Sequence, residues 1–387
     1  MRTGVFGRNE IKRGFQHGQN KDESFTIISS YTMEVGYSLN SLITRSKITR
    51  RVGSSRLCSY ICQCYEHSDL VDCRARKLTS VPHGLPHGTW LLDLGGNVLT
   101  ELRSRTFAGL WSMRILVLSE SHIQQIHPQA FYSLSFLEKL DMSRNHISEL
   151  PVDFSQSLSS LKELRLDHNA LEQVAPHSLE HLESLEKLDL SHNHILNLGP
   201  GAFRGLSRLR HLYLQSNWLG TVRDGSFSML PGLELLLLGH NNISLIETDA
   251  FAPLHSLALL GLEGNRLEHL KFKTFLNLHT SGTHLQLAAN PWSCDCDLHR
   301  VFGKILSVRH LHVDDYRNVT CREPWQLAGA SLAGIDSQLC MAETATVLII
   351  TGAVLVTVIA ALVTAEHNRK QKTKGWREAD AQDLQEK

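Results

Sequence analysis

The sequence has no excess of charge of either sign. Its 387 residues include 39 lysines and arginines and 39 aspartates and glutamates, so the formal net charge at pH 7 is zero. A protein whose main partner is nucleic acid usually carries a basic excess on its surface. The balanced charge therefore gives no indication that nucleic acid is the main partner.

Short motifs of catalysis are also missing. The sequence contains no G-x-S-x-G, no phosphate-binding G-x-x-x-x-G-K and no H-E-x-x-H. Pairs of acids such as Asp141 and Asp189 fall at equivalent positions of a repeat, where a solvated polar residue is the ordinary expectation. We therefore expect a protein that is not an enzyme and that needs no cofactor and no catalytic metal.

Residues 1–57 lack the apolar run of a signal peptide, since no seven consecutive residues are apolar. The segment is basic, with ten arginines and lysines against four aspartates and glutamates. Three explanations remain open: an incorrect or alternative start, an unusual translocation route, or an intracellular isoform. We favour the first, and expect residues 1–57 to be disordered or foreign to the mature protein.

What the sequence does have is a repeat, seen most clearly in the stretch Leu185–Arg208. Leu188 and Leu190 alternate like a strand, and Asn193 stands where its amide can satisfy backbone groups at a turn. Burying the unit's seven apolar side chains would contribute ~10 to 20 kcal/mol. Ordering its backbone would cost ~25 to 50 kcal/mol. One unit therefore cannot fold alone and must stack on neighbours.

The neighbours are present at a fixed spacing. Every interval between successive positions equivalent to Asn193 is 24 residues, except the last, which is 25. We call these ladder positions, and they are Asn97, Ser121, Asn145, Asn169, Asn193, Asn217, Asn241, Asn265 and Asn290. A period of this length with this pattern is typical of leucine-rich repeats. Serine at position 121 predicts the weakest turn of the array.

A second periodic position carries a phenylalanine and predicts an apolar column towards the convex side. Its members are Phe107, Phe131, Phe203, Phe227, Phe251 and Phe275, with Leu179 substituting once and Phe154 one place early. Over residues 58 to 340 the chain closely resembles extracellular leucine-rich-repeat proteins with cysteine-rich flanks. The resemblance implies an α/β-type solenoid with a parallel sheet on the concave face, an irregular convex side and a disulfide cap at each end.

Eight cysteines form two groups of four, one on each side of the repeats. The groups are Cys58, Cys62, Cys64 and Cys73, then Cys294, Cys296, Cys321 and Cys340. An even count in two clusters favours disulfides in an oxidising compartment, and zinc is the alternative. Sequence alone allows three pairings in each group. The resemblance to the family's flanks implies Cys58–Cys64, Cys62–Cys73, Cys294–Cys321 and Cys296–Cys340. The expected domains are an N-terminal cap over 58–88, repeats over 89–289 and a C-terminal cap over 290–340.

A membrane helix is predicted at residues 344–365, which are 22 residues without a charge. At ~1.5 Å per residue they would span ~33 Å, which is enough to cross one lipid bilayer. Arg369, Lys370, Lys372, Lys374 and Arg377 follow, which predicts that residues 366–387 form a cytoplasmic tail. The interpretation is a single-pass type I protein of the plasma membrane, with its repeats outside.

The concave face is where we expect a protein partner to bind. Charged residues such as Arg165 and Asp189 occupy its early repeats, whereas later repeats present Tyr213, Leu235, Leu237 and Leu259. A polar stripe that passes into an exposed apolar and aromatic patch is typical of a protein-binding surface. The alternative is that Leu235 and Leu237 are shielded by a glycan, a loop or a second copy of the chain.

Other polar positions have less specific interpretations. Asn242 and Asn318 begin N-x-[ST] motifs and are predicted glycosylation sites. His168, His192 and His240 precede ladder positions, where they could tune binding between neutral and endosomal pH or simply be polar turn residues.

Three hypotheses follow. The first is a cell-surface glycoprotein that binds an extracellular or membrane protein in adhesion or receptor-type recognition, with homo-oligomers possible. The second is an auxiliary subunit that acts through its membrane helix and basic tail, because the layout is similar to auxiliary subunits of large-conductance potassium channels. An intracellular or soluble isoform is a third, weaker hypothesis.

Overall fold

The computed structural model describes residues 61–65, 69–276, 278, 280, 282–335 and 338–383. The predictions for residues 1–57 and for Cys58 lie outside these residues.

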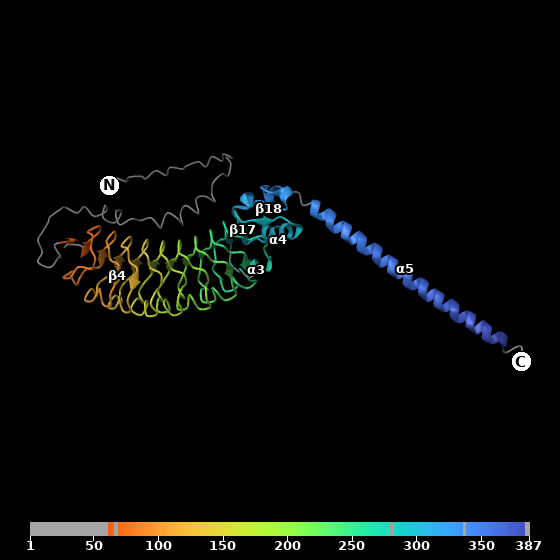
Figure 1. Cartoon of the computed structure of the whole chain (residues 1–387), viewed down its shortest axis with the longest axis horizontal. Coiled ribbons are helices and arrows are strands. Elements are labelled where there is room, and N and C mark those ends of the chain that lie inside the picture. The colour runs from red at the N-terminus through yellow and green to blue at the C-terminus, as the bar shows by residue number, and fades with distance from the viewer. Residues whose placement is uncertain are drawn as a thin grey trace, which may run out of the picture. The chain divides into compact units, whose positions relative to one another are not determined.

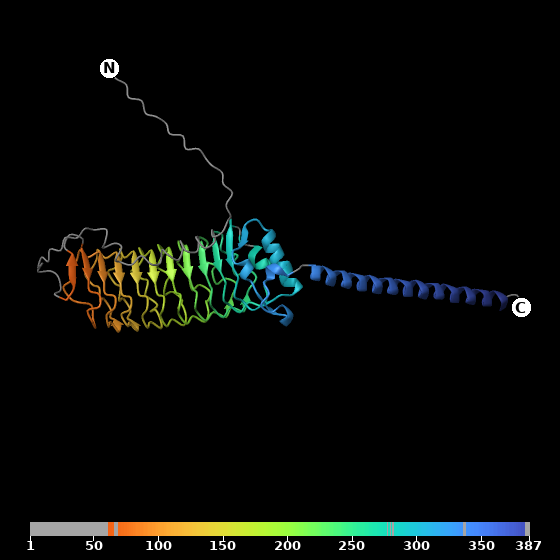
Figure 2. The same ribbon diagram turned by 90° about the horizontal axis from the view of Figure 1, so that it is seen from above.

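The main element is a twelve-stranded sheet that receives one strand from each repeat (Figures 1 and 2). Strands β1 (Gln63–Tyr65) and β2 (Leu70–Asp72) are antiparallel, and every later pair is parallel. The later strands are β3 (Leu91–Asp93), β5 (Ile115–Val117), β7 (Lys139–Asp141), β8 (Glu163–Arg165), β9 (Lys187–Asp189), β10 (His211–Tyr213), β12 (Leu235–Leu237), β14 (Leu259–Gly261), β15 (Thr283–Gln286) and β17 (Leu311–Val313). The sheet confirms the predicted solenoid.

The opposite side of each repeat is irregular, as predicted, because its residues lie mostly in tight backbone turns. Its regular elements are short: β4 (Glu101–Leu102) with β6 (Gln125–Ile126), β11 (Thr221–Val222) with β13 (Leu245–Ile246), and α3 (Lys273–Leu276). Phenylalanines stack beneath these turns. Phe227 lies between Phe203 and Phe251, with ring centroids 6.2 Å from each. The predicted second apolar column is therefore present.

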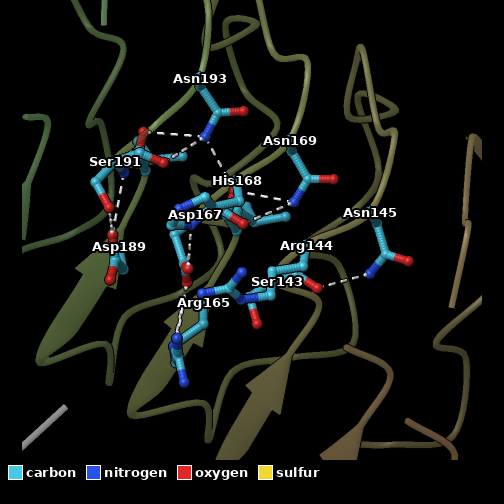
Figure 3. Close-up of polar contacts among 12 residues, drawn as sticks. Ser143, Arg144, Asn145, Arg165, Asp167, His168, Asn169, Asp189, Ser191 and Asn193 are labelled. Carbon is cyan, nitrogen blue, oxygen red and sulfur yellow. Dashed lines mark hydrogen bonds and ion pairs between the residues drawn. The ribbon is translucent and has the colours of Figure 1, made fainter. Parts of the chain in front are cut away.

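The ladder asparagines join neighbouring turns through buried hydrogen bonds. Asn193 Nδ2 donates to the carbonyls of Leu166 and Leu190, at 3.0 Å each, and its Oδ1 accepts from the Leu171 amide at 3.0 Å. The same arrangement recurs at Asn145 and Asn169. Figure 3 shows the three asparagines in a row on successive turns.

Ser121 keeps only part of this arrangement. Its hydroxyl donates to the Leu94 carbonyl at 3.0 Å. At other ladder positions the equivalent amide donates to the asparagine Oδ1. Here the Leu99 amide donates instead to the backbone carbonyl of Ser121 at 2.8 Å. The backbone thus compensates for the shorter side chain, and the predicted weakness of this turn stays a prediction.

Disulfides lie near both ends of the solenoid. Cys62 is bonded to Cys73, and Cys294 to Cys321. Cys64 and Cys296 are also disulfide-bonded, but their expected partners are Cys58 and the Cys340 side chain, which fall outside the described atoms. Those two pairings stay predictions.

The C-terminal cap is built on the helix α4 (Cys296–Ser307), which begins where the Asp295 side chain accepts a hydrogen bond from the Leu298 amide. Trp292 is fully buried beneath it and meets Phe302 edge-on, with ring centroids 5.9 Å apart. The cap is completed by β16 (Trp292–Ser293), β18 (Cys321–Glu323), η2 (Tyr316–Asn318), η3 (Trp325–Leu327) and η4 (Leu332–Gly334).

The last element is the helix α5 (Gln338–Asp383), which is much longer than the predicted 344–365. Its segment Leu348–Lys372 is long and apolar enough to cross a membrane, and its side chains are exposed in the isolated chain. The helix runs on because the basic residues that follow the apolar stretch are good helix formers.

Candidate functional site

The predicted apolar patch exists, but most of it is buried. Tyr213 on β10, Leu235 on β12 and Leu259 on β14 are 4%, 2% and 7% exposed, and Leu237 packs against them. The expectation that all four are exposed was therefore wrong for three of them. The parallel register brings equivalent positions to within ~4.8 Å of each other, so that large side chains cover their neighbours. We call these four residues the apolar cluster.

Arg165 on β8 lies in a network of acids rather than alone (Figure 3). Its guanidinium is 3.4 Å from an Asp141 oxygen and 3.1 Å from an Asp167 oxygen. Burial by itself would lower the pKa of Arg165, but the carboxylates outweigh it and the pKa is raised. The guanidinium is thus held within the sheet, partly buried.

Asp189 is another of the acids near Arg165, but it is only 5% exposed. One of its oxygens accepts hydrogen bonds from the Ser191 amide at 3.0 Å and the Ser191 hydroxyl at 2.6 Å. Burial, and then the nearby Asp167, raise the pKa of Asp189. Direct contact of Arg165 or Asp189 with a partner stays a prediction.

A feature that sequence reasoning missed lies beside the apolar cluster. Among the residues that the structure describes, Gln215 Oε1 and Glu263 Oε2 are buried acceptors without a hydrogen-bond partner. Burial, with a smaller contribution from Asp315, raises the pKa of Glu263 to about 7. Gly239 holds the equivalent position in the repeat between those of Gln215 and Glu263. A Cβ atom at Gly239 would collide with the Glu263 carboxylate. The glycines at 239 and 261 are the feature of the sequence that could have indicated this, because they leave room for the Glu263 side chain to fold over the backbone.

The histidines before the ladder positions are in contact with one another. His168 and His192 stack with ring centroids 4.2 Å apart, and Asp167 lies 3.0 Å from His168 Nδ1. Partial burial, and then His168, hold the pKa of His192 below its usual value. A role in pH-dependent binding stays a prediction.

The predicted glycosylation sites are both accessible. Asn242 and Asn318 are exposed, as are Ser244 and Thr320 two residues further on. Within the described part of the chain, no group of three or more His, Cys, Asp or Glu side chains could hold a metal ion.

Comparison with known proteins places this geometry in a family. A family model described as "Leucine rich repeat" matches residues 91–147, 136–195, 159–219 and 208–267. Reticulon-4 receptor-like 2 of Homo sapiens is 36% identical over 84 residues, which are 22% of this chain and 20% of that protein. Leucine-rich repeat-containing protein 3 of Bos taurus is 38% identical over 87 residues, 22% of this chain and 33% of that protein. The chain thus matches a third or less of the length of these two relatives.

A solved structure matches over a longer stretch. The crystal structure of human 5T4 (Wnt-activated inhibitory factor 1, trophoblast glycoprotein) has a TM-score of 0.57 and 29% identity. It covers 74% of this chain, and this chain covers 99% of it. The chain is therefore a leucine-rich-repeat protein with disulfides near both ends of its solenoid and one helix that is long and apolar enough to span a membrane.

Proposed function

We propose that the protein is a cell-surface glycoprotein which binds a protein partner non-covalently through its concave face, in adhesion or receptor-type recognition. It would be a single-pass type I protein of the plasma membrane, with the repeats outside and no catalytic activity. The apolar part of α5, followed by Arg369, Lys370 and Lys372, supports this orientation. The similarity to a protein named as receptor-like supports the class of function.

The observation that carries the proposal is the pair of acceptors beside the apolar cluster. Neither Gln215 Oε1 nor Glu263 Oε2 meets a donor in the described ranges. A buried polar atom left unpaired costs ~1 to 3 kcal/mol, so a partner whose binding shifts the side chains that cover these atoms would recover that energy by supplying a donor. Leu237, which is less buried than its neighbours, offers adjacent apolar contact. Donors that face Gln215 and Glu263, with an apolar group on Leu237, define the partner surface that fits best.

The test is a pair of matched substitutions in the full-length protein displayed on cells. Leu237→Asp places a charge on the concave face, whereas Leu196→Asp places the same charge at a residue that is 48% exposed outside the sheet. A panel of purified cell-surface ectodomains is the probe. We expect Leu237→Asp to reduce binding at least tenfold, by roughly 1.4 kcal/mol or more, and Leu196→Asp to leave it unchanged. Equal binding by both variants, at equal surface expression, would remove the concave face from consideration.

The auxiliary-subunit hypothesis makes the opposite prediction about α5. Replacing residues 342–387 with an unrelated membrane anchor should leave partner binding intact if the concave face is responsible. Loss of function after this exchange, with binding by the repeats unchanged, would instead favour action through the helix and its basic tail.

A further inference from the structure

The residue that follows each ladder position forms a column along the side of the solenoid, which we call the post-ladder column. Its members are Val98, His122, His146, Ala170, His194, Trp218, Asn242, Arg266 and Pro291. Their backbones are equivalent: the Trp218 amide donates to the Ile195 carbonyl at 3.0 Å, and the Asn242 amide to the Leu219 carbonyl at 3.0 Å. Trp218 and Asn242 are thus direct neighbours on adjacent turns.

Rings in the post-ladder column stack from one turn to the next. His122 and His146 have centroids 5.6 Å apart, and His194 and Trp218 have centroids 4.5 Å apart. His194 comes from the turn before Trp218 and covers one face of its indole. The other face is therefore turned towards the following turn, whose member of the column is Asn242. Trp218 remains 51% exposed, so that part of its indole is open to a contact.

Asn242 is suited to place a sugar on that face. It and Ser244 are exposed, and together they form an N-x-[ST] acceptor motif. Neighbouring turns lie ~4.8 Å apart, which is close to the 4.5 Å separation of the His194 and Trp218 rings. A pyranose ring linked to the asparagine amide begins about as far from the backbone as an indole ring does. It would therefore continue the stack by one ring.

We propose that Asn242 carries an N-linked glycan whose first sugar packs against the indole face of Trp218 that His194 leaves open. The apolar C–H face of a pyranose is complementary to the electron-rich face of an indole. In the transfer step, Asn242 Nδ2 bonds to C1 of a lipid-diphosphate-linked oligosaccharide. The bond from C1 to the phosphate oxygen breaks with its electron pair, and the amide nitrogen releases a proton. Trp218 is then a packing surface for the chain's own glycan.

The alternative is that a protein partner covers the open indole face of Trp218, because exposed tryptophans are frequent anchors of protein interfaces. The sequence of the post-ladder column favours the glycan, since the indole stands directly beside an acceptor asparagine. The two occupants differ in one measurable respect: only the glycan protects Trp218 in the purified protein without any partner.

The experiment uses the full chain made in mammalian secretory cells and purified in detergent. Peptide mass spectrometry after enzymatic deglycosylation reports whether Asn242 is occupied, and an unoccupied Asn242 would overturn the proposal. Acrylamide quenching of tryptophan fluorescence then reports the accessibility of Trp218. The chain has six tryptophans, so the contribution of Trp218 is taken as the difference from Trp218→Phe.

Ser244→Ala removes the acceptor motif and leaves the stacked side chains in place. We expect the quenching constant of Trp218 to roughly double in this variant, because the indole face that His194 leaves uncovered becomes open to the quencher. Thr320→Ala, which removes the motif at Asn318, should leave Trp218 unchanged. If Ser244→Ala folds poorly, the folded parent protein is deglycosylated enzymatically instead. This treatment should raise the quenching constant of Trp218 as Ser244→Ala would. Equal protection of Trp218 with and without the Asn242 glycan would show that something else covers the indole, and would overturn the proposal.

Discussion

Each ladder asparagine satisfies backbone groups of two turns with one side chain. Asn193 is 2% exposed and binds the carbonyls of Leu166 and Leu190 and the amide of Leu171. Removing it would leave these buried groups unpaired, whereas Ser121 shows that a hydroxyl can serve some of them.

We expect Asn193→Ala to destabilise the protein by ~2 to 5 kcal/mol, and Asn193→Ser by clearly less. Thermal unfolding of the full chain in detergent, followed by circular dichroism, compares the two variants with the parent. A serine variant no more stable than the alanine variant would contradict this account of Ser121.

Glu263 makes stability depend on pH. Its pKa is about 7 in the folded chain, above the 4.5 of an unperturbed glutamate, so the folded state binds the proton more tightly than the unfolded state. The stability gained from this proton is complete below pH ~4.5 and is lost as the pH rises towards ~7, by up to ~3 kcal/mol. Glu263→Gln should flatten this part of the profile. Unfolding measured across that range checks it, and the exposed control Glu149→Gln should keep the slope of the parent.

At the scale of elements, the phenylalanine column ties the turns of the convex side together. Phe227 is fully buried between two other rings, yet the column tolerates Leu179 at the equivalent place. We expect Phe227→Ala to cost ~3 to 5 kcal/mol through the cavity it leaves, and Phe227→Leu to cost much less. Chemical denaturation of both variants tests this. A leucine variant as unstable as the alanine variant would show that ring stacking, and not filled volume, stabilises the column.

The strands were predictable because each depends on a local pattern that is repeated in register. The fold and the phenylalanine column follow from that periodicity. The candidate site was less predictable, because exposure depends on neighbours 24 residues away. Leu235 and Leu259 cover each other across the sheet, and Glu263 folds over Gly239. The repeat period alone predicts which face of the sheet a side chain lies on. It does not predict how much of that side chain the neighbouring repeats cover.

For the molecule as a whole, α5 contains the segment that is long and apolar enough to hold the chain in a membrane. Deleting residues 348–372 should release the chain from membranes, because the helix is the candidate span found in the described residues. Alkaline carbonate extraction of membranes from transfected cells measures this. Exchanging the same segment for a polyleucine helix is the matched control and should retain membrane association. Retention of the deleted form in the membrane pellet would contradict the assignment of α5.

The uniform register of the sheet also sets distances on the concave face in whole units. Every strand from β3 to β14 pairs with the next at a shift of 24 residues. Loss or gain of one complete unit, such as Leu185–Arg208, would therefore move Arg165 relative to Tyr213 by one strand spacing, ~4.8 Å, without changing the contacts within either group. Chains of this design can vary the span between two binding features only in equal steps, so their specificity for partners of different length would change in discrete increments.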